Sequence, residues 1–310
     1  MAVSIAGGFG GVLPLFELNA FLPQKPDLPM WERILREFQE QGGYLLRFHA
    51  DNITRCEHIQ QLTALADALG LAPYTAINGV KSGYSPLDAD VLAQTNLYCV
   101  SIMTDSKLIG DESYAEDIQR IMATKTKLEL YLKITKSTLW VLEPVAEFCL
   151  AHAIPACIVD IERFPHNAAE KLTGEAYLDA VQRCMELNRR YVGRLRMSVA
   201  DCPYLCAMGT LNMKGGCTAG VISCAVTEDG ILLPCAEMAH LPVGDLKRSP
   251  LSQLWQTSAV FMRLRDRSTL TGRCGVCLHR EKCGGCRAES YIVNGDYFGG
   301  DPLCPIAPEG

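Results

Sequence analysis

The sequence lacks the features that direct a chain to a membrane or to nucleic acid. Its net charge is −6 and it contains no arginine-rich patch, whereas a nucleic-acid surface needs a basic stripe. The apolar stretch 1–22 contains no lysine or arginine and is interrupted by glycines and Pro14. It therefore has no basic n-region of a signal peptide and is too short to span a bilayer. We expect a cytoplasmic protein that binds neither a membrane nor nucleic acid.

Cysteine is absent before Cys56, yet the chain has 15 cysteines. An odd number leaves at least one thiol unpaired in any scheme made of disulfides alone, and the cytosol keeps thiols reduced. The composition, 48% hydrophobic and 21% charged, is otherwise that of a soluble globular protein. The cysteines therefore indicate metal ligation rather than disulfides.

The first two thirds of the chain alternate short apolar runs with helical patterns. This alternation is typical of βαβ units and a parallel sheet, and about six units fit before residue 200. Since a closed barrel needs eight, the pattern predicts an α/β fold, either a partial (β/α) barrel or an open doubly wound sheet. The predicted strands are 44–50, 72–79, 97–105, 127–135, 154–162 and 193–200, and the predicted helices are 30–43, 57–70, 114–123, 139–153 and 174–191.

The amino-acid composition changes after residue 200, where cysteine, glycine and proline become frequent. Residues 221–235 have the pattern of a hairpin that turns at Asp229–Gly230, and residues 250–266 have helical spacing. The stretch 267–310 has no periodicity, so bound metal rather than a hydrophobic core is expected to organise it. We predict one domain over residues 1–205 and a second, cysteine-rich domain over 206–310.

Eight cysteines of this second region form the candidate metal site. Two residues between cysteines let both sulfurs face one ion, and this spacing occurs twice within "CGVCLHREKCGGC" (274–286). Eight thiolates make two four-coordinate sets, which suit two tetrahedral zinc ions or two iron–sulfur cubanes, and the spacing does not choose between them. The eight are Cys217, Cys224, Cys235, Cys274, Cys277, Cys283, Cys286 and Cys304.

Their arrangement resembles the SPASM domain, the auxiliary-cluster module at the C-terminus of many radical S-adenosylmethionine (SAM) enzymes. The text between the cysteines agrees with this resemblance: "GCTAG", "EDGILLPC", "CGGCRAESY" and "GDYFGGDPLC" are most similar to the subgroup that modifies tetrapyrroles on the routes to heme. The resemblance covers residues 215–305 and implies iron–sulfur clusters rather than zinc. It rests on Cys217-x12-Gly230-x4-Cys235, on Cys274-x2-Cys277-x5-Cys283-x2-Cys286, and on Cys304 seventeen residues later.

By this resemblance the chain holds two [4Fe–4S] clusters. One would be ligated by Cys274, Cys277, Cys283 and Cys304. The other would be ligated by Cys217, Cys235 and Cys286, with Cys224 as the fourth ligand unless that iron is left open for a substrate. Cys202 and Cys206 are alternative candidates for this fourth ligand.

The radical SAM motifs that hold SAM itself are missing. The family places Cys-x3-Cys-x2-Cys after its first barrel strand, where this chain has Phe21, Leu22 and Pro23. A Gly-Gly-Glu-Pro motif follows the family's next strand, where this chain reads His49, Ala50, Asp51 and Asn52. We therefore expect a partial (β/α)6 radical SAM-type barrel that has lost its SAM-cleaving centre, with no SAM as cofactor.

A few other residues are weak candidates for a catalytic or binding role. His49 and Asp51 would lie at the C-terminal mouth of a strand, where barrel sites are built, and Arg47 and Arg163 are similar candidates. Glu237 follows Cys235 by two residues, but sulfatase-maturing relatives place an aspartate directly after that cysteine, where this chain has Ala236.

Three functions fit these observations. The first is a redox or scaffold protein that passes electrons to, or presents substrate to, a protein partner: a catalytic radical SAM enzyme, a redox protein or a peptide substrate. The second is an enzyme that modifies a peptide or a tetrapyrrole and uses an auxiliary cluster as its substrate site. The third is a structural zinc protein.

Overall fold

A computed structural model describes residues 14–77, 86–163, 167–172, 174–200 and 216–304. The chain falls into two compact units. We call Phe21–Trp31 with Leu46–Asp201 the barrel unit, and Met1–Ala20 with Glu32–Leu45 and Cys202–Gly310 the cysteine-rich unit.

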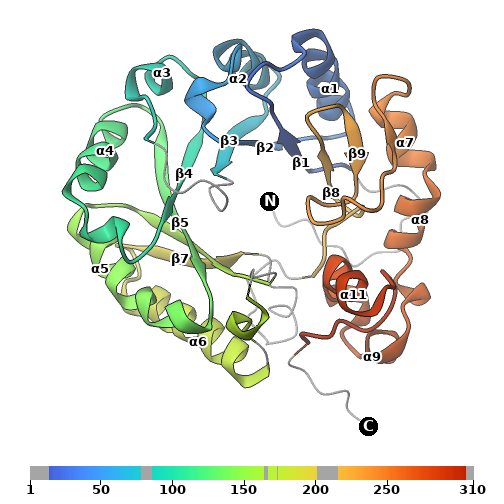
Figure 1. Cartoon of the computed structure of the whole chain (residues 1–310). Coiled ribbons are helices and arrows are strands. Elements are labelled where there is room, and N and C mark those ends of the chain that lie inside the picture. Colours follow the sequence, from blue (N-terminus) through green and yellow to red (C-terminus); the bar gives the residue numbers. More distant parts are fainter. Residues whose placement is uncertain (1–13, 78–85, 164–166, 173, 201–215, 305–310) are drawn as a thin grey trace. The chain divides into compact units, whose positions relative to one another are not determined.

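The barrel unit is a sheet whose strands follow one another in chain order, with parallel pairing from β3 to β7. Figure 1 shows the helices that connect these strands on the outer side of the curved sheet. The strands are β2 (Leu45–Ala50), β3 (Ala72–Ile77), β4 (Cys99–Thr104), β5 (Lys127–Ile134), β6 (Ala156–Ile161) and β7 (Arg196–Ala200). The helices are α2 (Ile59–Ala68), α3 (Ala89–Ala93), α4 (Glu112–Met122), α5 (Leu142–Ala151) and α6 (Gly174–Arg190), with 3-10 turns η1 (Ile53–Arg55), η2 (Leu108–Gly110), η3 (Lys136–Val141) and η4 (Ala168–Glu170).

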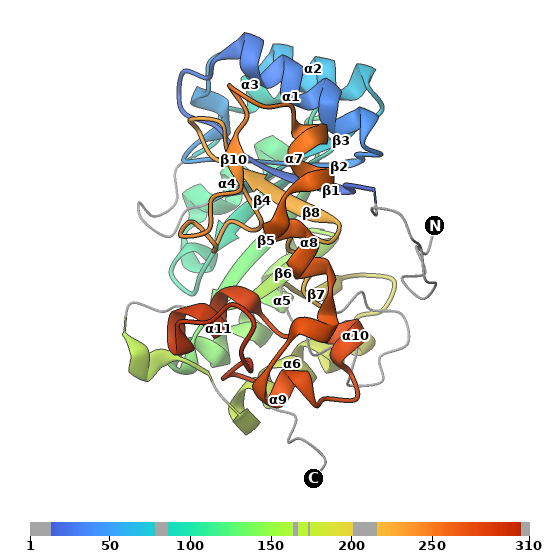
Figure 2. The same ribbon diagram turned by 90° about the vertical axis from the view of Figure 1, so that its right-hand side faces the viewer.

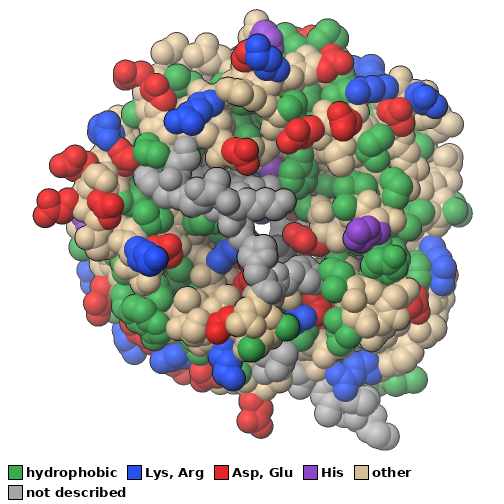
Figure 3. Space-filling model, viewed as in Figure 1, with side chains coloured by type: hydrophobic (Ala, Val, Ile, Leu, Met, Phe, Trp, Pro, Cys, Tyr) green, Lys and Arg blue, Asp and Glu red, His purple; other side chains and the backbone are tan. Residues whose placement is uncertain are grey.

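Strand β5 shows why the sheet is covered on its outer side. Side chains alternate between the faces of a strand, and Leu128, Leu130, Leu132 and Ile134 are all buried on the face that carries the helices. The opposite, concave face of β5 carries polar residues of the range 129–133 instead. Over the outer helices acidic and basic side chains are interspersed on the face seen in Figure 3, which is usual for a solvated helical layer.

The cysteine-rich unit contains a small mixed sheet in the order β1-β8-β9-β10. Its strands are β1 (Glu17–Phe21), β8 (Ser223–Val226), β9 (Ile231–Leu233) and β10 (Gly244–Asp245). Strand β1 pairs in parallel with β8, so that Leu18 lies opposite Cys224, although about 200 residues separate the two strands. This pairing places the N-terminal strand against the part of the chain that carries the candidate metal ligands.

In its described residues, this unit also contains six helices. Figure 2 shows α7 to α10 following one another along one side of it. From α1, Arg33 Nη2 donates to Leu246 O over 2.5 Å and Glu37 Oε2 accepts from Leu251 N over 2.6 Å, which fixes the start of α7. The helices are α1 (Leu28–Glu40), α7 (Leu251–Thr257), α8 (Ala259–Arg265), α9 (Gly272–Gly275), α10 (Arg280–Cys283) and α11 (Arg287–Asn294), with a 3-10 turn η6 (Arg267–Thr269).

The α/β class and the positions of the main elements are confirmed. All six strands and all five helices predicted before residue 200 are present within a few residues of their predicted bounds. The predicted hairpin is β8 and β9, and it turns where Gly230 takes φ +84° and donates to Thr227 O over 2.9 Å.

The helical spacing predicted for residues 250–266 is confirmed, but it belongs to two helices, α7 and α8, because the chain is interrupted at Ser258. Ser258 is extended, with ψ 127°, and its Oγ caps α8 by accepting from Val260 N over 3.2 Å. Trp255 and Phe261 pack edge to face across the break, with ring centroids 4.9 Å apart. Helical spacing is therefore kept on both sides of a break that a serine N-cap creates.

Two further predictions concern the domain boundary and membrane-spanning helices. The boundary between domains 1–205 and 206–310 stays a prediction, since residues 201–215 are not described. Among the described helices, none is both long and apolar enough to cross a membrane.

Candidate metal centre

All eight candidate ligands lie in the cysteine-rich unit. No disulfide joins any of the cysteines in the described ranges. Cys202 and Cys206 lie outside the described residues. Cys224 is on β8, Cys274 is on α9, Cys283 ends α10, and Cys286 is the N-cap of α11, while the other four lie in turns beside these elements.

At least four of the eight sulfurs accept a backbone N–H bond. A donor aimed at sulfur favours the thiolate over the thiol, and such bonds also help set the potential of an iron–sulfur cluster. The bonds run from Asp301 N to Cys274 Sγ (3.3 Å), from His279 N to Cys277 Sγ (3.4 Å), from Gly285 N to Cys283 Sγ (3.4 Å) and from Glu289 N to Cys286 Sγ (3.4 Å). The backbone around these cysteines therefore directs N–H donors at their sulfurs.

A buried arginine faces one of these sulfurs. Arg287 is fully buried, and its Nη2 lies 3.5 Å from Cys274 Sγ. Its Nη1 donates to Tyr297 O and to Gly299 O over 2.9 Å each, while its buried Nε has no hydrogen-bond partner. A buried cation needs a negative charge nearby, and an anionic cluster ligated by Cys274 would supply one. The donor set thus fits an iron–sulfur cluster.

A buried carboxylate joins two of the ligand segments. Asp301 is fully buried; its Oδ2 accepts from Cys286 N over 2.6 Å and its Oδ1 from Leu303 N over 3.0 Å. The N–H of Asp301 also donates to Cys274 Sγ on α9. Asp301, in the segment that ends in Cys304, is therefore bonded both to α9 and to the start of α11.

The two predicted ligand sets meet at Cys217 and Cys283. Cys217 N donates to Cys283 O over 2.8 Å, and Cys217 O accepts from Arg267 Nη2 over 2.5 Å. Gly216, with φ +96°, permits this approach, because a Cβ there would lie 2.0 Å from Lys282 O. A ligand predicted for one cluster is therefore hydrogen-bonded to a ligand predicted for the other.

The hairpin brings Cys224 and Cys235 to neighbouring strands. Ala225 pairs with Leu233, so Cys224 stands one residue before this pair on β8 and Cys235 two residues after it on the other side. Cys224 is fully buried, which raises the pKa of its thiol; Glu17 adds to the rise. Glu237 is exposed, so the arrangement does not present it as an enclosed acid or base.

Within the described residues, no three or more His, Cys, Asp or Glu side chains are grouped closely enough to hold a single metal ion. This finding concerns one-ion sites, in which all ligands converge on one centre. The ligands of a cubane each bind a different iron and do not converge in this way.

Gly285 lies where a side chain has no room, and its replacement gives a testable result. Its φ is +59°, and a Cβ there would lie 2.7 Å from Arg287 Nη2, 2.8 Å from Asp301 Cβ and 3.1 Å from Cys274 Sγ. We expect Gly285→Ala to lower iron retention and melting temperature, by an amount corresponding to about 2–3 kcal/mol. Gly295→Ala is the control, since Gly295 has φ +71° but open space around it. Equal effects in both variants would show that only backbone strain matters.

In the barrel unit the predicted residues His49 and Asp51 do not come together as a site. His49 is 8% exposed and stacks on Phe21, with centroids 4.5 Å apart and rings 13° from parallel. His49 O also accepts from Leu22 N over 2.8 Å, whereas Asp51 is exposed. Asn52 caps η1 by accepting from Thr54 N. The end of β2 is thus packed against the segment after β1.

A polar network on the concave face of the sheet was not predicted. Glu129 on β5 accepts from Ser101 Oγ over 2.5 Å and pairs with Arg196 over 3.5 Å. Further along β5, Lys133 Nζ forms an ion pair with Glu162 Oε2 over 2.9 Å. The signal was present in "KLELYLKI", where every second residue is polar or amphipathic. Tyr131 donates to Asp160 over 2.7 Å, Arg47 donates to the Tyr74 hydroxyl over 3.0 Å, and Arg163 is buried.

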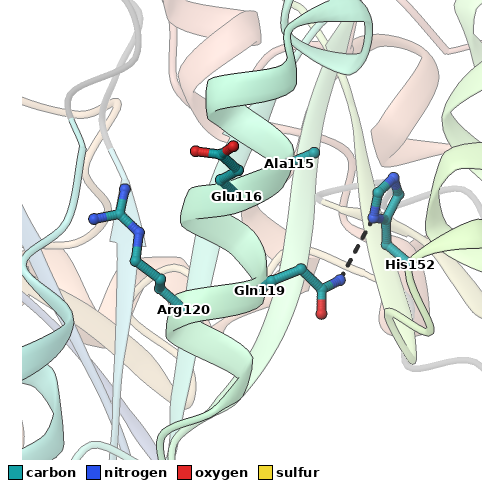
Figure 4. Close-up of a pocket in the computed structure, with 5 residues that line it drawn as sticks. All are labelled: Ala115, Glu116, Gln119, Arg120 and His152. Atoms are coloured by element: carbon teal, nitrogen blue, oxygen red, sulfur yellow. Dashed lines mark hydrogen bonds between the residues drawn. The ribbon is translucent and has the colours of Figure 1, made fainter.

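One shallow depression, about 450 Å³ in volume, lies on the helical layer of the barrel unit. It is lined by Ala115, Glu116, Gln119, Arg120 and His152. Figure 4 shows the Gln119 amide and the His152 ring pointing toward each other, with Nε2 and Nδ1 3.4 Å apart. His152 is the C-cap of α5, and its ring lies 4.3 Å from that of Phe148 with the two planes tilted by 37°.

Comparison with known proteins gives a match to the cysteine region. Residues 217–287 match the SPASM family, described as an iron–sulfur cluster-binding domain. The AdoMet-dependent heme synthase of Methanosarcina barkeri is 38% identical over 98 residues, which are 31% of this chain and 27% of that protein. The one from Nitratidesulfovibrio vulgaris is 34% identical over 96 residues, 31% of this chain and 26% of that protein. The similarity thus spans about a quarter of the length of these relatives.

The whole chain matches solved structures in its fold. SuiB of Streptococcus suis, in its complex with S-adenosylmethionine, gives a TM-score of 0.74 at 17% identity, covering 95% of this chain and 78% of SuiB. The enzyme anSMEcpe, with bound AdoMet, gives a TM-score of 0.63 at 12% identity, covering 91% of this chain and 93% of that one. Residues 217–287 therefore match the SPASM iron–sulfur cluster-binding domain, and the chain shares the fold of SuiB and anSMEcpe.

Proposed function

We propose that the protein carries two auxiliary [4Fe–4S] clusters and serves a catalytic partner as a redox or substrate-presenting component, without cleaving SAM itself. The observation that carries this proposal is the set of N–H bonds to the sulfurs of Cys274, Cys277, Cys283 and Cys286. When bound, such clusters supply one-electron chemistry at potentials set by nearby charge and hydrogen bonds. The chain's own contribution is to hold the ligands, to bury Arg287 beside them and to exclude water from Cys274 and Cys283.

The same proposal assigns Cys274, Cys277, Cys283 and Cys304 to one cluster and Cys217, Cys224, Cys235 and Cys286 to the other. The bond between Cys217 N and Cys283 O supports an interlaced arrangement of the two sets. The position of Cys224 beside Cys235 in the hairpin supports it as the fourth ligand of the second set.

The absence of SAM cleavage is supported by the contact between Phe21 and His49. Related enzymes have a cluster-binding loop after the first strand and a SAM-binding motif after the second. Here an aromatic stack and the bond from Leu22 N to His49 O occupy these positions. Neither residue supplies a thiolate for iron or a carboxylate for the SAM amino group.

The partner or substrate of the proposed function is a peptide or a tetrapyrrole-modifying system. SuiB has been solved with its precursor peptide SuiA, and the relatives that match the cluster domain are heme synthases. Because the sequence match to the heme synthases is confined to about a third of this chain, it supports cluster binding more directly than it supports a substrate.

Metal and sulfide analysis of anaerobically purified protein tests the cluster part of the proposal. We expect brown protein with about eight irons and eight sulfides per chain, four of each for every cubane. Colourless protein with two zinc ions and no sulfide would instead establish the structural zinc site.

Incubation with SAM and a strong reductant tests the remaining part. We expect no 5′-deoxyadenosine from protein that retains its full iron content, because the residues at both SAM-binding positions are replaced. An authentic radical SAM enzyme assayed in parallel provides the positive control. Release of 5′-deoxyadenosine by this chain would contradict the proposal and favour a modifying enzyme.

A further inference from the structure

Two exposed apolar side chains flank one of the proposed cluster ligands. Val276 is 76% exposed and Leu278 is 82% exposed, while Cys277 between them is half-buried. Single exposed apolar residues are common on protein surfaces. Two of the most exposed large ones in the described chain, however, stand on either side of a single cysteine that is proposed to bind iron.

The turn that carries them is held by hydrogen bonds instead of apolar packing. It connects α9 to α10, which are labelled in Figure 2. His279 N donates to Cys277 Sγ over 3.4 Å and Arg280 N donates to Cys277 O over 3.0 Å. Arg280 Nη1 also donates to Gly275 O over 3.0 Å. Since these hydrogen bonds fix the backbone, the turn does not need the side chains of Val276 and Leu278 to fold.

The charge around this turn is opposite in sign to that of the whole chain. Residues 273–282 contain three basic residues, Arg273, Arg280 and Lys282, and one acidic residue, Glu281, in a chain of net charge −6. Arg273 and Lys282 are exposed, and Arg280 pairs with Glu281 over 2.9 Å. An apolar centre with a basic margin fits a partner with an acidic surface.

We propose that this surface, formed by Arg273, Val276, Leu278 and Lys282 around Cys277, is the docking site of a small acidic electron-transfer protein. The inference rests on the proposed function, because it takes Cys277 to be a cluster ligand. The partner, carrying a flavin or a [2Fe–2S] centre, would lose one electron at this surface, and the cluster that Cys277 would help to hold would accept it. Small, transient interfaces are usual for redox partners, which matches an apolar centre of only two side chains.

Stopped-flow kinetics with a reduced plant-type [2Fe–2S] ferredoxin, a small acidic one-electron donor, test this inference. The protein is used anaerobically in its cluster-loaded, oxidised form, and salt is raised from about 0.02 to 0.5 M, over which the Debye length falls from roughly 20 Å to 4 Å. We expect the second-order rate constant to fall steeply with salt. We expect the Val276→Ser/Leu278→Ser variant to react about tenfold more slowly, and Lys282→Glu to react more slowly with a weaker salt dependence.

Two controls separate docking from damage to the cluster. Val192→Ser removes an apolar side chain that is 80% exposed and lies in the barrel unit, and it should react as the parent protein does. The methyl viologen radical, which needs no docking surface, should reduce all variants at one rate, and their iron contents should be equal. Equal ferredoxin rates for the parent and the double variant, a rate indifferent to salt, or no reduction of the parent by ferredoxin would overturn the inference. Iron-free protein would overturn the proposed function instead.

Discussion

Replacing Cys274 by serine is expected to remove one of the two proposed clusters, so that iron and sulfide fall to half or less of their content in the parent protein. The sulfur of Cys274 accepts both from Asp301 N and from Arg287 Nη2. Loss of the cluster would also remove the group that we propose to organise the short helices of residues 267–304, because metal-binding energy is folding energy in cysteine-rich modules. We expect the loss of iron to be accompanied by a lower melting temperature.

Iron and sulfide analysis together with visible absorption provides the measurement. Cys99→Ser is a matched control, because Cys99 is a half-buried cysteine on β4 with no proposed ligand role; burial raises the pKa of its thiol to about 12. We expect Cys99→Ser to retain all of its iron. If Cys274→Ser kept the full iron and sulfide content and an unchanged spectrum, the proposed ligand set would be wrong.

Replacing Arg287 by glutamine is expected to lower the reduction potential of the cluster at Cys274. Reduction adds a negative charge, and a nearby buried cation stabilises the more negative state, so its removal favours the oxidised state. Unit charges about 7 Å apart interact by about 2 kcal/mol at an effective dielectric constant of 20, which corresponds to roughly 100 mV for one electron. Arg287→Gln also leaves Tyr297 O and Gly299 O with fewer donors, so we expect a loss of stability of about 3 kcal/mol.

A potentiometric titration followed by electron paramagnetic resonance separates these two effects. Arg287→Lys keeps the charge but not the forked geometry of the guanidinium, so we expect it to be destabilised while its potential stays close to that of the parent. Lys282→Gln removes an exposed charge and should change the potential little, because water screens it. A potential that is unchanged in Arg287→Gln would show that Arg287 serves packing alone.

Much of the barrel was predictable because its signals are local. Alternation of apolar runs with helical spacing placed β2 to β7 and their helices, since side-chain periodicity reflects which face of each element is buried. The hairpin at Gly230 was equally local, because it depends on a turn residue that tolerates positive φ. The break at Ser258 was missed because apolar residues continue at helical spacing on both sides of it.

The candidate metal site was predictable in its ligands but not in its surroundings. The Cys-x2-Cys pairs bring sulfurs together through a few bonds of chain, so spacing alone identifies them as candidate ligands. The contacts of buried Arg287, the bond that Asp301 accepts from Cys286 N and the contact of Cys217 with Cys283 join residues that are 10 to 66 positions apart. Phe21 likewise meets His49 only in the folded chain.

By itself, the sequence determined the order of strands and helices, the positions of the thiols and the lack of the Cys-x3-Cys-x2-Cys and Gly-Gly-Glu-Pro motifs. These depend on neighbouring residues, whose geometry the covalent chain restricts. Only the tertiary structure decided that β1 pairs with β8, that the concave face of β5 is polar and that a guanidinium is enclosed beside Cys274. Contacts of this kind are selected by how the whole chain buries its apolar surface and satisfies its buried charges, and no short window of sequence contains that information.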